Sequence, residues 1–127
     1  MKANLQDFTN RYVAVWNEAD ADRRRSGIET FWAVDGSHFM PTRAFTGHDK
    51  LKERVEEAYQ ELVRDRGFTF RLHGDPSGHH GIVKYVWEMV DPRSSAIIAL
   101  GSTVLRLDEN DRIVSEHQFV EPLSVHA

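Results

Sequence analysis

The second half of the chain alternates apolar and polar residues in long segments that short turns separate. Residues 68–73, 81–90, 96–107 and 113–121 follow a period of two, which is typical of β-strands. The connections between them are rich in Gly, Pro, Asp and Asn, residues that favour tight turns. This pattern predicts four strands that follow one another as hairpins, with residues 74–78 as a turn or a bulge.

The first half of the chain follows the helical period instead. Apolar side chains recur every three or four residues over 4–19, 20–32 and 49–64, which predicts three amphipathic helices. Gly67 follows the third helix, at the position where a helix commonly ends in a left-handed residue. Because each helix has one apolar face, we expect all three to cover one side of the sheet.

A short fifth strand is predicted between the second and third helices. Residues 34–39 alternate, and Pro41 ends the segment because proline cannot donate a hydrogen bond to a neighbouring strand. We expect residues 43–46 to form a loop. The order is then α-α-β-α-β-β-β-β, an α+β fold class in which three N-terminal helices pack on a curved, mainly antiparallel sheet. Residues 1–127 are expected to form one such cone-shaped α+β barrel, with a cavity that suits a small ligand.

Composition narrows the classes of partner. The chain has 127 residues, 40% of them hydrophobic and 28% charged, as in an ordinary globular domain. Its net charge of −4 argues against nucleic acid and against an anionic membrane as partners. The absence of cysteine excludes disulfides, a thiol nucleophile and Cys-based zinc sites. No segment has the length of a signal peptide's apolar core or of a membrane span, so we expect a soluble, cytoplasmic protein.

Four segments carry a resemblance to a known superfamily. They are RYVAVWNEAD at 11–20, FWAVDGSHFMP at 31–41, the Gly47 loop, and LRLDENDRIVSEHQFVEP at 105–122. In their order and spacing the chain resembles the nuclear transport factor 2-like superfamily, which includes SnoaL-like polyketide cyclases, ketosteroid isomerases, limonene epoxide hydrolases and scytalone dehydratases. The resemblance implies a cone with a ligand cavity and a dimer formed sheet to sheet. It does not imply one reaction, because the fold hosts several.

Carrying over the residues of the ketosteroid isomerases leaves one match. Tyr12 corresponds to the tyrosine that polarises the substrate carbonyl in those enzymes. Met40 stands where they have the proton-shuttling aspartate, and their hydrogen-bonding acid falls near Thr103. Steroid isomerisation is therefore not expected. SnoaL-like cyclases place an acidic residue near the end of the last strand, and Glu121 resembles that position.

Acid–base candidates follow from strand alternation. If Met40 faces the cavity, a period of two places His38 on the same face. On the last strand Ile113 and Phe119 indicate the inner face, which would also carry His117 and Glu121. Because residues four apart on a strand are roughly 13 Å apart, His38 is the better partner for either of these two. The candidate catalytic residues are His38, His117, Glu121 and Tyr12. The alternative is that both histidines are polar residues of a half-wet pocket or satisfied core residues.

Large aromatic residues lie on the elements that should surround the cavity. They would suit a flat apolar or aromatic molecule, although aromatic residues also dominate ordinary cores. No metal site is predicted at His73, His79 and His80, because neighbouring strand residues point to opposite faces. No cofactor is expected either. The candidate ligand-binding residues are Trp16, Trp32, Met40, Tyr85, Trp87, Thr103 and Phe119.

Two classes of function remain open. The first is a cofactor-independent isomerase, dehydratase or cyclase that binds a small, mostly apolar molecule and uses general acid–base chemistry. The second is a non-catalytic ligand-binding or dimeric interaction module. Under both we expect a homodimer through the outer face of the sheet, because alternation leaves a set of apolar side chains there that water would not cover favourably. These are Ile82, Val86, Val90, Ile98 and Val104.

Overall fold

The first two helices begin at polar caps, and the helices pack side by side in the computed structural model, which describes residues 4–123. Helix α1, Leu5–Asn17, begins at Asn4, whose side chain accepts a hydrogen bond from the backbone of Asp7 at 2.9 Å. Helix α2, Ala21–Phe31, begins in the same way at Asp20. Helix α3, His48–Ala58, continues as a π-helix, η1, over Tyr59–Arg64. No helix of this part of the chain is long and apolar enough to cross a membrane.

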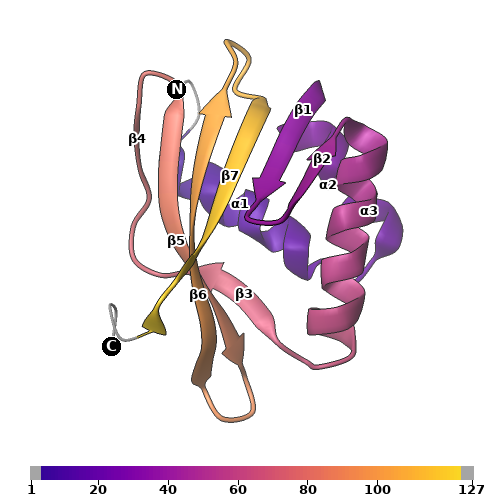
Figure 1. The fold of residues 1–127 in the computed structure, drawn as a ribbon, viewed down its shortest axis with the longest axis vertical. Helices are drawn as coiled ribbons and strands as arrows, with labels where there is room; N and C mark the ends of the chain where they lie inside the picture. Colours follow the sequence, from indigo (N-terminus) through magenta and orange to yellow (C-terminus); the bar gives the residue numbers. More distant parts are fainter. Residues whose placement is uncertain (1–3, 124–127) are drawn as a thin grey trace.

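The sheet has seven strands. They are β1 Trp32–Met40, β2 Arg43–Thr46, β3 Thr69–Leu72, β4 Ser77–His79, β5 Ile82–Asp91, β6 Ala96–Leu107 and β7 Ile113–Glu121. Their order is β2-β1-β7-β6-β5-β3, and β4 pairs with β5. Only the β1–β7 pairing is parallel among those described. Figure 1 shows the helices together on one side of this curved sheet, so the predicted α+β cone is confirmed.

The predicted loop at residues 43–46 is wrong, because this segment is the edge strand β2. It pairs antiparallel with β1, with Ser37 opposite Thr46 and Met40 opposite Arg43. Phe45 is the one buried side chain of the four residues. A strand of four residues with one buried side chain is too short for its alternation of apolar and polar residues to be recognised in the sequence.

A β-bulge near the start of β7 decides which side chains face the helices. Ile113 lies opposite Leu107, and Ser115 lies opposite Arg106, so Val114 is an extra residue on β7. Such a bulge reverses the alternation of the residues that follow it. The inner face of the sheet, which the helices cover, therefore receives Glu116 and Gln118 beyond the bulge.

The core lies between the helices and this inner face. Its largest enclosed apolar side chains come from all the layers, so helices and sheet share one core. They are Tyr12 from α1, Ile28 from α2, Leu51 from α3, and Trp32, Leu105 and Ile113 from the sheet.

Candidate functional site

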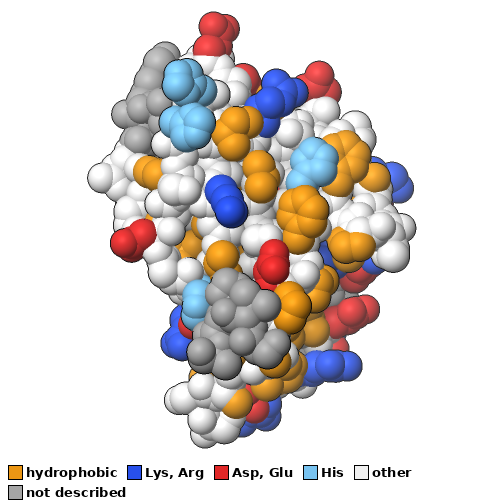
Figure 2. All heavy atoms as spheres, turned by 60° about the vertical axis from the view of Figure 1, so that its left-hand side comes forward, with side chains coloured by type: hydrophobic (Ala, Val, Ile, Leu, Met, Phe, Trp, Pro, Cys, Tyr) orange, Lys and Arg blue, Asp and Glu red, His pale blue; other side chains and the backbone are white. Residues whose placement is uncertain are grey.

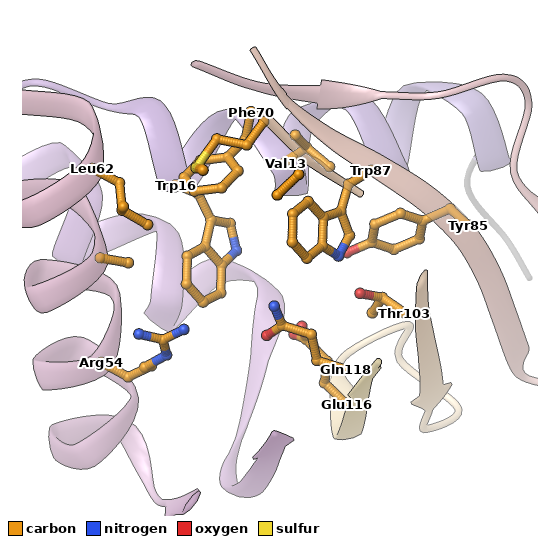
Figure 3. A pocket seen from close by; sticks show the side chains of 13 residues that line it. Val13, Trp16, Arg54, Leu62, Phe70, Tyr85, Trp87, Thr103, Glu116 and Gln118 are labelled. Carbon is orange, nitrogen blue, oxygen red and sulfur yellow. The ribbon is translucent and has the colours of Figure 1, made fainter. Parts of the chain in front are cut away.

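A cavity of about 150 Å³ opens between α1, the α3–η1 segment and the inner face of the sheet. Figure 3 shows side chains from these elements converging on it. Most of the wall is apolar, which fits a small organic molecule rather than a polar solute. The apolar lining is Val13, Trp16, Ala58, Leu62, Phe70, Trp87, Met89 and Ala99. The polar lining is Arg54, Tyr85, Thr103, Glu116 and Gln118.

Glu116 is the acidic group of this wall. Only 3% of the residue is exposed. The Tyr12 hydroxyl donates a hydrogen bond to Oε1, and Nδ1 of His38 lies 3.4 Å from Oε2. Burying a carboxylate is costly unless it is hydrogen-bonded, and Tyr12 supplies that bond. Neither Tyr12 nor His38 lines the cavity itself, so Glu116 is the member of the trio that a ligand would meet.

The two enclosed tyrosines stay protonated. Burial raises the pKa of Tyr12 well above its ordinary value, and the negative charge of Glu116 raises it further. The same two causes raise the pKa of Tyr85, which lines the cavity. A hydrogen bond from Thr103 opposes the shift at Tyr85. Both hydroxyls therefore act as hydrogen-bond donors over the whole neutral range.

His38 is a buried histidine that lies beside this carboxylate. It is 1% exposed, and neither ring nitrogen makes a hydrogen bond to a residue within 4–123. Its ring packs beside those of Trp16 and Phe45, at centroid distances of 5.7 and 6.0 Å. A small movement of Glu116 or of the ring would close the 3.4 Å gap into a hydrogen bond. His38 is thus placed to orient Glu116 rather than to touch a ligand.

Arg54 brings a positive charge to the opposite side of the cavity. It belongs to α3, and 12% of its side chain is exposed. Nη1 donates to Oε1 of Glu57 at 3.2 Å, and the guanidinium lies 5.7 Å from the ring centroid of Trp16. Burial lowers the pKa of Arg54, and the charge of Glu57 partly offsets this.

Eight of the eleven candidate residues of the sequence fall into three groups in the structure. Trp16, Tyr85, Trp87 and Thr103 line the cavity. Tyr12 and His38 contact Glu116 from outside the lining. Trp32 and Met40 belong to the neighbouring core and do not line the cavity.

The inward orientation predicted for His117, Phe119 and Glu121 is wrong. His117 is exposed and stacks on Phe39 at a centroid distance of 4.8 Å. Phe119 is 50% exposed, and Glu121 accepts a hydrogen bond from Ser102 at 2.7 Å. The bulge at Val114 is the physical reason, because it moves this set to the outer face, away from the helices.

Sequence reasoning missed Arg54, Glu116 and Gln118. Glu116 and Gln118 do alternate, and they would have been found had the inner face been counted from Val114 rather than from Ile113. Arg54 carried no such signal, because a charged residue on an amphipathic helix is normally solvated. Within residues 4–123 no group of three or more His, Cys, Asp or Glu side chains is arranged to hold a metal ion.

Solved structures with this fold include several SnoaL-like proteins. A candidate isomerase of the SnoaL-like family from Agrobacterium tumefaciens has a TM-score of 0.84 and 27% identity, over 93% of this chain and 97% of that one. A SnoaL-like protein of unknown function from Burkholderia thailandensis has a TM-score of 0.73 and 15% identity, over 96% and 98% of the two chains. A candidate polyketide cyclase from Sinorhizobium meliloti has a TM-score of 0.66 and 10% identity, over 88% and 93%.

These similarities define the class of protein. The fold is that of the nuclear transport factor 2-like proteins, as the sequence predicted, and SnoaL-like proteins are among the solved structures that the chain is similar to. No protein-family model and no curated protein matches the sequence. The reaction must therefore be inferred from the cavity and its polar residues.

Proposed function

We propose that the protein binds a small, mostly apolar molecule in the cavity and moves a proton on it with Glu116, without a cofactor. Isomerisation, dehydration and cyclisation are the reaction classes that such a step serves. The observation that supports the proposal is the position of Glu116, a buried carboxylate at an otherwise mostly apolar wall, with Tyr12 and His38 beside it. Neighbours with this fold that are described as a candidate isomerase and a candidate polyketide cyclase agree with it.

The polar lining suggests how the step would run on a carbonyl compound. Glu116 takes a proton from the carbon next to the carbonyl group; the C–H electron pair forms a C=C bond, and the π pair of the carbonyl group moves onto its oxygen. The Tyr85 hydroxyl and the Gln118 amide are donors in the same wall, and they would stabilise that oxygen. Return of the proton from Glu116 to another carbon completes an isomerisation. Tyr12 and His38 act as positioning residues that hold the carboxylate in place.

Hydrogen exchange in heavy water tests this step directly. The protein is incubated with a panel of small aromatic ketones, and deuterium at the carbon next to the carbonyl group is followed by NMR. We expect catalysed exchange that falls by at least ~100-fold in Glu116→Gln, the usual size of a general-base contribution. Glu121→Gln makes the same change on the outer face of β7 and should keep the wild-type rate.

The alternative function, a non-catalytic ligand-binding module, predicts a different result. Ligands would still shift the melting temperature of the protein, and Glu116→Gln would change only their affinity. Binding without exchange for every ketone in the panel would contradict the catalytic proposal and favour this alternative.

We also propose that the outer face of the sheet forms a homodimer. Hydrophobic side chains lie over this face among charged residues and histidines, as Figure 2 shows. Lys84 and Glu121 share the face, so a two-fold axis could bring opposite charges of two copies together. Ile98→Asp should then shift the protein to a monomer in sedimentation experiments, and a wild-type monomer would contradict the proposal. The exposed apolar residues are Phe39, Ile82, Ile98 and Phe119, whereas Val90 on the same face is buried.

A further inference from the structure

Arg54 is the feature of the cavity that the proposed proton transfer does not use. It lies in the wall together with the apolar side chains of Ala58 and Trp16, and most of it is enclosed. Its Nε is buried and makes no hydrogen bond to any residue in the described part of the chain. An enclosed cation with an unpaired donor is costly, and a ligand that supplies an acceptor would relieve the cost.

The hydrogen bonds of Arg54 leave its guanidinium group only partly paired. Among residues 4–123 Glu57 is the one carboxylate bonded to Arg54, and Glu57 is shared with Arg43. Arg43 occupies both oxygens of Glu57, at 2.6 and 3.1 Å, whereas Arg54 has a single bond of 3.2 Å. Two guanidinium groups thus share one carboxylate. Across the cavity Oε1 of Glu116 is already bonded to Tyr12.

We propose that Arg54 binds a carboxylate group of the substrate, so that the cavity takes a small aromatic or apolar carboxylic acid. The inference rests on the proposed function, since it concerns a ligand of the same cavity. A guanidinium group matches a carboxylate with two parallel hydrogen bonds, and these are strong where water is excluded. The remaining polar lining offers no second cation among the residues that surround the cavity.

Size and geometry limit the rest of the molecule. The volume of about 150 Å³ equals that of cavities which hold one benzene molecule, so a single ring fits. In Figure 3 Arg54 enters from α3, Glu116 and Gln118 enter from the strand side, and the indoles of Trp16 and Trp87 lie beside the space between them. An acid bound to Arg54 would therefore present its ring to the indoles and its remaining carbons to Glu116.

Phenylacetate and phenylacetamide make a matched pair of probes, because they differ in charge and hardly in shape. Their dissociation constants are measured by quenching of tryptophan fluorescence, to which the lining residues Trp16 and Trp87 respond, and by calorimetry. We expect phenylacetate to bind at least ~10-fold more tightly, as a charge-assisted bidentate contact implies. Arg54→Met should remove this preference and leave the affinity for phenylacetamide nearly unchanged.

Two further variants keep the test decisive. Arg54→Lys retains the charge without the planar fork and should restore part of the preference. Arg25→Met removes an exposed arginine of α2 and should keep the full preference. Equal binding of both probes by the wild type, or a preference that survives in Arg54→Met, would overturn the inference and leave the proton-transfer proposal standing. If neither probe binds and no ketone exchanges, both proposals fail.

Discussion

Replacing Tyr12 by Phe tests whether the buried Glu116 is charged and held by its hydroxyl partner. The change removes one oxygen and keeps the ring, which packs against Phe31 and Trp32 at centroid distances of 5.6 and 6.5 Å. It also leaves a carboxylate that is 3% exposed without its donor. A hydrogen bond to a charged group is worth roughly 1.5–3 kcal/mol, and we expect the free energy of unfolding at neutral pH to fall by that amount.

The expected change in melting temperature follows from the length of the chain. At about 2.1 cal/mol/K per residue, 127 residues give an unfolding entropy near 0.27 kcal/mol/K. The loss then corresponds to a drop of roughly 6–11 °C. Chemical denaturation measures the free energy, and calorimetry measures the temperature. Tyr59→Phe removes the same oxygen from a less enclosed ring and should change the free energy by at most ~0.5 kcal/mol.

A double-mutant cycle with Glu116→Gln isolates the contact between the two side chains. We expect the two single changes to be non-additive by at least ~1 kcal/mol, because each removes the same hydrogen bond. Additivity to within ~0.5 kcal/mol, or a Tyr12→Phe protein as stable as the wild type, would refute the idea that this bond holds a charged Glu116.

Three other perturbations address the cavity wall and the titrating groups. Gly101→Ala places a Cβ 2.1 Å from Cζ2 of Trp87, so the indole must move. We expect the free energy of unfolding in denaturant to fall by roughly 1–3 kcal/mol and phenylacetamide to bind more weakly. An unchanged affinity for phenylacetamide would contradict this. The pKa values of Tyr12 and Tyr85 are raised in the fold, so their contribution to the free energy of unfolding is complete below pH 10.0 and declines above it. Urea unfolding at pH values on both sides of 10.0 should show this decline, and a free energy that does not change with pH would contradict it. Burial raises the pKa of Glu88, but hydrogen bonds from His73 and Arg71 bring it below 4.5. The contribution of Glu88 to the free energy of unfolding is therefore present above that pH and is lost as the pH falls. Glu88→Gln should make the free energy of unfolding depend less on pH in the acidic range.

The fold was predictable where the alternation is long. Strands β6 and β7 begin and end at the predicted residues, since each has at least nine residues bounded by turn sequences. Strand β2 was missed because it buries Phe45 alone. The π-helical turn from Tyr59 was also missed, because the helical spacing of apolar residues continues through it and changes too little to mark it.

The candidate site was predictable only in its aromatic part. Tyr85 and Trp87 lie on a strand that is regular along this stretch, so their side of the sheet could be counted from the sequence. Glu116 could not be found in this way, because the bulge that turns it inward is marked by Val114, a residue that also suits a regular strand. Arg54 lines the cavity because the sheet curves toward α3, and the pattern of residues along a helix does not predict that curvature.

The bulge at Val114 means that strand β7 encodes two alternative linings, one residue apart. With Val114 bulged out of the ladder, the cavity receives Glu116 and Gln118. If Val114 instead took part in a regular ladder, the alternation would run unbroken from Ile113 and would place Ser115, His117 and Phe119 on the inner face. The acidic residue of the cavity therefore depends on the geometry of one strand, because a change that straightens the bulge would turn Glu116 away from the cavity with no substitution in the cavity itself.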